Sequence, residues 1–146
     1  MPEKKTLKKA RKAKREGKAP TTQAGPFVEE EIEHVREGKH GARSTKQAIA
    51  IGLSKARRAG VKLPPPPKSA SERTKRSAKS AAKRKGQKPS PTRSRASKRA
   101  LKREPRSTVS RKALSRQATS AARRRPASAR KASAKKAAKT RARRHA

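Results

Sequence analysis

The stretch GPFVEEEIEHVREGKHGARSTKQAIAIGLSKARRAG, residues 25–60, decides the fold because it holds more than half of the large apolar residues of the chain. Val28, Ile32 and Val35 recur at the spacing of one helix face. Glutamates fill the first turn of this segment, where they complement the positive end of a helix. The pattern predicts a helix over residues 26–37.

Capping residues mark the ends of this helix and the start of a second one. Pro26 suits the first helical position, where its missing N–H costs nothing, and Gly38 suits the position after the last turn. Ser44 followed by Gln47 matches the S-x-x-Q capping box. A second helix is therefore predicted over residues 45–59, with a glycine directly after it.

The predicted second helix has two faces that suit packing. Ile49 and Leu53 lie one turn apart, and we expect them to pack on the apolar stripe of the first helix. Small residues form a seam that permits close approach of the two helices: Ala48, Gly52 and Ala56. A helical hairpin of this size is marginal as a monomer, so we expect a homodimer, or a protein partner bound at its acidic face.

The composition argues against a large core. The chain has 146 residues, with 47 Lys and Arg against nine Glu and no Asp, which gives a net charge of +38. Thirteen residues are Leu, Ile, Val or Phe, too few to offset the entropy of ordering the whole chain. We therefore expect a mostly disordered protein around a small all-α hairpin, with a tail that becomes helical when bound.

Changes in composition divide the chain into four segments. These are a basic N-terminal arm (1–20), the hairpin module (21–63), a proline linker (64–67) and a low-complexity basic tail (68–146). The tail has 30 basic and two acidic residues. Its Ala, Lys and Arg favour helix, whereas repulsion between like charges one turn apart opposes it. We expect the free tail to be disordered.

Catalysis and metal chemistry find little support. The chain has no Cys and no Asp, and its serines have no base at a recognisable spacing. Glu31 and His34 have the spacing of two ligands on one helix, but a single helix offers too few of them. We expect no enzyme activity, no cofactor and no metal site.

Several observations bear on location. No segment approaches the run of about 18 apolar residues that a membrane span needs. The N-terminus is basic and lacks the apolar core of a secretory signal. We therefore expect a cytoplasmic, nucleoid-associated protein that does not bind membranes.

The basic tail is the strongest functional signal. Lys and Arg at this density bind phosphate backbones and release counterions. With one Phe and no Trp or Tyr, the chain lacks the aromatic platforms used to bind single strands. The expected function is sequence-independent DNA binding of a histone-like kind. Alternatives are an RNA- or ribosome-associated protein, or an adaptor whose hairpin binds another protein.

The candidate nucleic-acid-binding residues fall into two groups. The first lies in and after the loop between the predicted helices, where helix N–H groups, two glycines and three cations suit an anion. The second consists of basic clusters in the tail. The complete set is Lys39, Arg43, Ser44, Lys46, Arg57, Arg58, Lys83, Arg84, Lys85, Arg93, Arg95, Arg123, Arg124, Arg125, Lys135, Lys136, Arg141, Arg143 and Arg144.

Two resemblances add to this interpretation. Residues 21–67, and above all TQAGPFVEEEIEHVREGKHGARSTKQAIAIGLSKARRAGVKLPPP, resemble a family of small basic bacterial proteins that carry a domain of unknown function. The resemblance implies a bacterial setting and no particular activity. The tail is similar in composition to linker-histone C-terminal domains and to Lys- and Ala-rich bacterial histone-like proteins.

Overall fold

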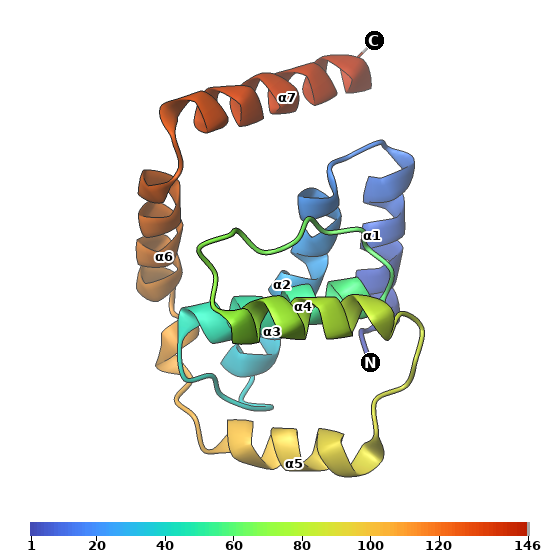
Figure 1. The fold of residues 1–146 in the computed structure, drawn as a ribbon, viewed down its shortest axis with the longest axis vertical. Helices are drawn as coiled ribbons and strands as arrows, with labels where there is room; N and C mark the ends of the chain where they lie inside the picture. Colours follow the sequence, from blue (N-terminus) through green and yellow to red (C-terminus); the bar gives the residue numbers. More distant parts are fainter. Residues whose placement is uncertain (146) are drawn as a thin grey trace.

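A computed structural model describes residues 1–145 and places them in seven α-helices and one 3-10 turn, without a strand in that part of the chain (Figure 1). The prediction of a mostly disordered chain with a single hairpin is therefore wrong. The elements are α1 (Lys4–Arg15), α2 (Pro20–Arg36), α3 (Thr45–Arg58), α4 (Glu72–Lys83), α5 (Pro91–Lys102), the turn η1 (Ser107–Val109), α6 (Arg111–Arg124) and α7 (Ala127–His145).

Helix α2 begins six residues earlier than the sequence predicted. It starts at Pro20, and Pro26 lies inside it. The residue before a proline is disfavoured in helical conformation because its Cβ meets the proline ring, and Gly25 has no Cβ. The predicted end is confirmed: α2 stops at Arg36, and Gly38 adopts a φ of +78°. Pro20, and not Pro26, therefore occupies the first position of this helix.

The first apolar cluster joins α1, α2 and α3. It is built from Ala10, Ala24, Phe27 and Ala56, with Leu7, Leu53, Val61 and Leu63 packed against it. Helix α1 buries three residues on α2 and so is part of the packed domain rather than a free basic arm. Leu53 therefore packs beside Phe27 and not, as predicted, on the stripe of Ile32 and Val35.

The second apolar cluster includes a residue from the tail. Val35, Ala42 and Ala48 surround Val109, which is 1% exposed, and Ile32 packs against them. Val109 lies more than 60 residues after the nearest of these partners in the sequence. The predicted boundary between hairpin and tail is therefore not a boundary in the packing.

The small-residue seam of α3 is confirmed. Ala48, Gly52 and Ala56 are its buried residues. A Cβ at Gly52 would lie 2.7 Å from the Cα of Val28 on α2. The two helices therefore approach each other at the distance that only glycine permits.

The tail helices form largely without a core. Helix α4 packs on α3 through Ala78 and Ala81, whereas α5, α6 and α7 bury no residue. Ser71 and Ser110 cap α4 and α6 by accepting backbone hydrogen bonds. Helix propensity and these caps outweigh the charge repulsion that led us to expect disorder, because the basic side chains project into solvent, where their charges are screened.

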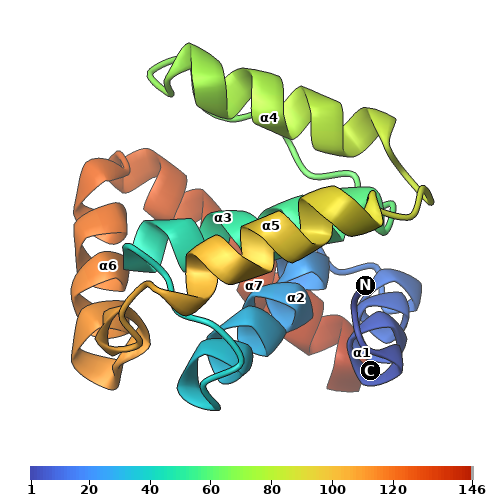
Figure 2. The ribbon, with the colours of Figure 1, turned by 90° about the horizontal axis from the view of Figure 1, so that it is seen from below.

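The tail helices are spread around the α1–α3 core. Helices α5 and α7 lie at opposite ends of the molecule, with α6 at its side (Figure 1). The view from below shows α4 and α5 as separate rods, not as one bundle (Figure 2). In residues 1–145, no helix combines the length and the apolar character needed to cross a membrane.

Candidate nucleic-acid interface

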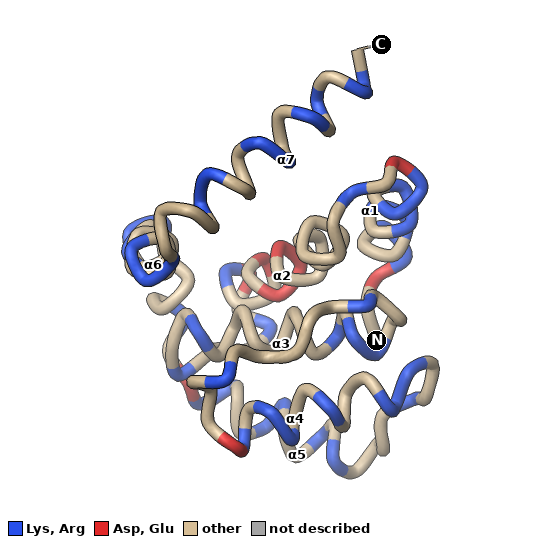
Figure 3. Tube along the Cα trace, turned by 45° about the horizontal axis from the view of Figure 1, so that its top comes forward, with Lys and Arg blue, Asp and Glu red and all other residues tan. Residues whose placement is uncertain are grey.

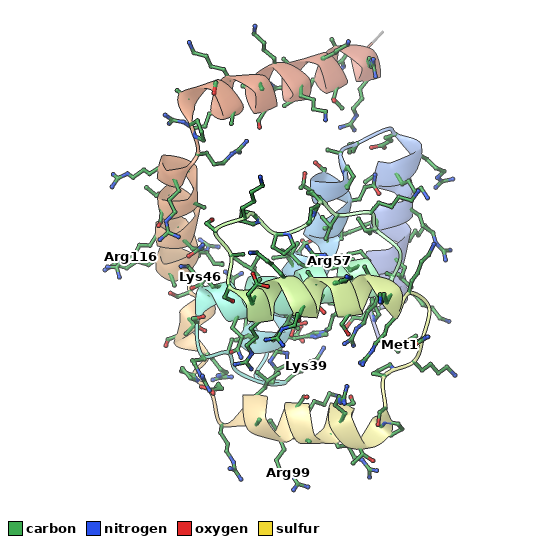
Figure 4. All side chains as sticks on the ribbon, in the orientation of Figure 1. Met1, Lys39, Lys46, Arg57, Arg99 and Arg116 are labelled. Atoms are coloured by element: carbon green, nitrogen blue, oxygen red, sulfur yellow. The ribbon has the colours of Figure 1, made fainter. Side chains whose placement is uncertain are left out.

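The predicted nucleic-acid-binding residues are almost all exposed. Of the whole set, Arg57 and Arg58 alone are half-buried. The structure does not gather the others into one cleft but distributes them over the start of α3, the end of α4, and α5, α6 and α7. Side chains such as Arg99 of α5 and Arg116 of α6 project away from the core (Figure 4). The interface is a dispersed basic surface.

Arg57 and Arg58, at the end of α3, form hydrogen bonds to other segments of the chain. Arg57 donates from Nη2 to the Pro64 carbonyl at 3.3 Å, and burial lowers the pKa of its guanidinium. The carbonyl of Arg58 accepts from the backbone N–H of Gly86 at 2.9 Å. These residues thus tie the proline linker and the end of α4 to α3, and their half-buried side chains are less accessible to a ligand than the exposed basic residues of the tail.

Glutamates are largely neutralised within the molecule. In residues 1–145, Glu33 is the one glutamate that forms no ion pair. Six of the 47 Lys and Arg side chains pair with a glutamate: Lys9, Lys18, Lys39, Arg43, Lys55 and Lys75. Acidic residues gather on α2, while basic residues cover the tail helices (Figure 3). The charged side chains without an ion-pair partner in the described part of the chain are therefore almost all cationic.

Three exposed groups show the electrostatic effect of this pairing. A hydrogen bond from His34 lowers the pKa of Glu3, and the Lys18 ammonium, 2.6 Å away, lowers the pKa of Glu16. The hydrogen bond to Glu37 raises the pKa of Lys39. Each of these three pKa shifts favours the charged form of the group named, Glu3, Glu16 or Lys39.

In the loop that was predicted to bind an anion, three backbone N–H groups already donate to other residues of the chain. Gly41 donates its backbone N–H to the Leu101 carbonyl at 2.8 Å, and Ala42 donates to Pro105 at 3.0 Å. Arg43 donates its N–H to the Gln47 side chain at 2.6 Å. These three N–H groups are therefore not available to a phosphate.

The polar and charged side chains around this loop differ in whether they already have a partner within the chain. Ser44 caps α3 by accepting from the Gln47 N–H at 3.1 Å, which confirms the capping box signal. The Lys39 ammonium is 2.9 Å from Glu37, and the Arg43 guanidinium is 3.6 Å from Glu104. Lys46 is exposed and forms no ion pair in the described part of the chain (Figure 4).

One face of α6 combines guanidinium and hydroxyl groups. An open hollow of about 520 Å³ is lined by Ser115, Arg116, Thr119, Ser120, Arg123 and Arg124. Sequence analysis selected two of these arginines and missed Arg116, although it lies seven and eight residues, about two turns, before them and so on the same face. Donors of these two kinds suit phosphate oxygens.

A buried charged cluster was not foreseen. The Glu31 carboxylate is 1% exposed and lies 2.7 Å from His40 Nε2 and 2.6 Å from Lys55 Nζ. Glu30, also buried, lies 3.7 Å from the same ammonium. Sequence analysis took these glutamates for an outer acidic face. The Glu-rich pattern does not reveal that the loop and α3 would cover them.

Comparison with known proteins adds a family and nothing further. Neither the search of curated proteins nor that of solved structures found a match. The matched region spans α1, α2, α3 and the proline linker, and so extends the predicted resemblance to the N-terminal helix. Residues 4–68 match the family model of DUF6496, a family of unknown function.

Proposed function

We propose that this protein binds double-stranded DNA through its phosphates, without sequence selectivity, and associates with the bacterial nucleoid. The observation that carries the proposal is the separation of charge. In residues 1–145, nearly all the glutamates are paired within the molecule, while the basic side chains of the tail helices, apart from Lys75, have no acidic partner. Such a surface attracts a polyanion and releases its counterions.

Helix α7 shows how the surface suits a duplex. Its 19 residues span about 28 Å and bury no side chain. A duplex of that length carries roughly 17 phosphate charges. Basic residues lie around this helix rather than on one face, so it can meet phosphates on either side without a fixed register.

The distribution of apolar groups favours a duplex over the other candidates. Phe27 is the one aromatic residue besides the histidines, and it is fully buried, so no exposed Phe, Tyr or Trp ring is available to stack on a single strand. Met1 is the exposed large hydrophobic residue of the described chain. An adaptor or a stable homodimer would need an apolar patch that this surface lacks.

The test is a binding assay by fluorescence anisotropy with the full chain. Two unrelated DNA duplexes of about 24 base pairs are compared with an RNA duplex of equal length over a range of salt. We expect equal affinity for the two DNA sequences and a linear fall of log K with log salt, about −0.9 per phosphate contacted. A sequence preference of about 10³-fold, or tighter binding of RNA than of DNA, contradicts the proposal.

Matched variants test which charges act. Neutralising Arg123, Arg124 and Arg125 with glutamine should make the salt slope shallower by about 2 to 3, because three phosphate contacts are lost. The control replaces Lys9, Lys18 and Lys75, which already pair with glutamates. It changes the net charge equally and should alter the slope less. Equal slopes for the two variants would argue against contacts by the tail helices.

A further inference from the structure

Three potential metal ligands converge where α2 ends. Glu31 and His34 lie one turn apart on α2, and His40 returns to them from the following loop. Their ligand atoms all lie within 4.8 Å of one another. Glu31 and His40 are buried, and the His34 side chain is 16% exposed. The loop thus supplies the third ligand that a single helix could not offer.

The hydrogen bonds of His40 orient it for a cation. Its Nδ1 donates to the Gly41 carbonyl at 2.8 Å, an arrangement typical of metal-binding histidines because it fixes the tautomer. Nε2 faces Glu31 Oε1 at 2.7 Å, the distance of a hydrogen bond. A proton shared by these two atoms and a metal ion bound by both are alternative occupants of this position.

The balance of buried charge also calls for a cation. Glu30 and Glu31 are 3% and 1% exposed, and they share the single ammonium of Lys55. Among the described residues, Glu30 Oε1 accepts no hydrogen bond, and Glu31 Oε2 has the Lys55 ammonium as its ion-pair partner, 2.6 Å away. A buried charge without compensation is strongly unfavourable, so the cluster needs one more positive charge.

We infer that Glu31, His34 and His40 bind a divalent transition-metal ion, zinc being the best match. Two imidazoles and a carboxylate are a known zinc ligand set, completed by a fourth ligand. Tetrahedral zinc would separate Glu31 Oε1 and His40 Nε2 to about 3.3 Å, a small movement from the observed 2.7 Å. Glu3, whose Oε1 lies 3.2 Å from His34 Nε2, or a water molecule would supply the fourth position.

Such an ion would act as a structural clamp. It would join the end of α2 to the loop that holds the Leu101 and Pro105 carbonyls through Gly41 and Ala42. Binding to the folded chain alone stabilises it by mass action. The zinc site does not depend on the proposed DNA binding, so each proposal can be tested without the other.

The test is titration of the chelator-treated full chain with Zn²⁺ alone, followed by calorimetry. We expect one ion per chain and a rise in the thermal midpoint that a chelator reverses. His34→Gln should weaken binding at least tenfold. His145→Gln removes the exposed histidine of α7 and should leave the affinity unchanged. Equal affinities for the two variants, or no binding by the unmodified chain, would overturn the inference.

A second measurement needs no variant. In nuclear magnetic resonance spectra, the ring signals of His34 and His40 should shift together and be complete at one equivalent of Zn²⁺, while His145 stays in place. If His40 shares only a proton with Glu31, its signals will not respond to zinc. That result also overturns the inference.

Discussion

Gly52 shows how one residue sets the distance between two helices. A Cβ there would lie 2.7 Å from the Cα of Val28 and 3.0 Å from its nitrogen, and backbone atoms cannot rotate away. Gly52→Ala should therefore lower the free energy of unfolding by about 1–3 kcal/mol, even though alanine favours helix over glycine by about 1 kcal/mol. Urea denaturation measures the change.

The control for Gly52→Ala lies on the exposed face of the same helix. Ala50→Gly meets no neighbouring helix at that face and reports the propensity effect alone, a loss of about 1 kcal/mol. If Gly52→Ala instead raises stability by the same amount, α2 and α3 do not pack at the distance described.

At the scale of the elements, a single substitution should release the segment between α5 and α6 from the loop before α3. A Cβ at Gly41 would fall on the Glu104 carbonyl. Gly41→Ala should detach the segment, expose Val109 and speed amide hydrogen exchange at Ala42, which now donates to Pro105. Exchange followed by mass spectrometry measures this.

A double variant separates release of the segment from general loss of stability. Val109→Ser removes the apolar anchor of the same segment and should have the same effect on exchange. Because either change alone detaches the segment, the double variant should speed exchange by much less than the sum of the two single effects. Full additivity would mean that the contacts at Gly41 and Val109 act independently.

The elements also show which features a sequence can predict. The cap at Ser44, the stop at Gly38 and the seam at Gly52 depend on neighbouring residues and were predicted correctly. The packing of α1 was missed because this helix packs mainly through alanines, and a count of large apolar residues leaves alanine out. The docking of the tail was missed because main-chain carbonyls supply most of it, and every residue has one. The cluster around Glu31 needed a loop conformation that no spacing reveals.

For the whole molecule, the charge of +38 opposes folding through self-repulsion. Raising NaCl from about 20 mM to about 500 mM shortens the Debye length from roughly 20 Å to roughly 4 Å. We expect the thermal midpoint of the free protein to rise over this range, as followed by circular dichroism. A fall would mean that the ion pairs of the six paired Lys and Arg side chains stabilise the fold more than the remaining charges destabilise it.

The carbonyl-mediated docking of the tail has a consequence for how the sequence can change over generations. Gly41 and Ala42 bind Leu101 and Pro105 through the main-chain oxygens of those two residues, so exchanges of Lys for Arg, or of Ser for Ala, leave these bonds intact. The contact then depends on few residues, chiefly Gly41 in the loop and Val109 in the tail. Other positions of the tail can therefore change among basic and helix-forming residues while the tail docks in the same way.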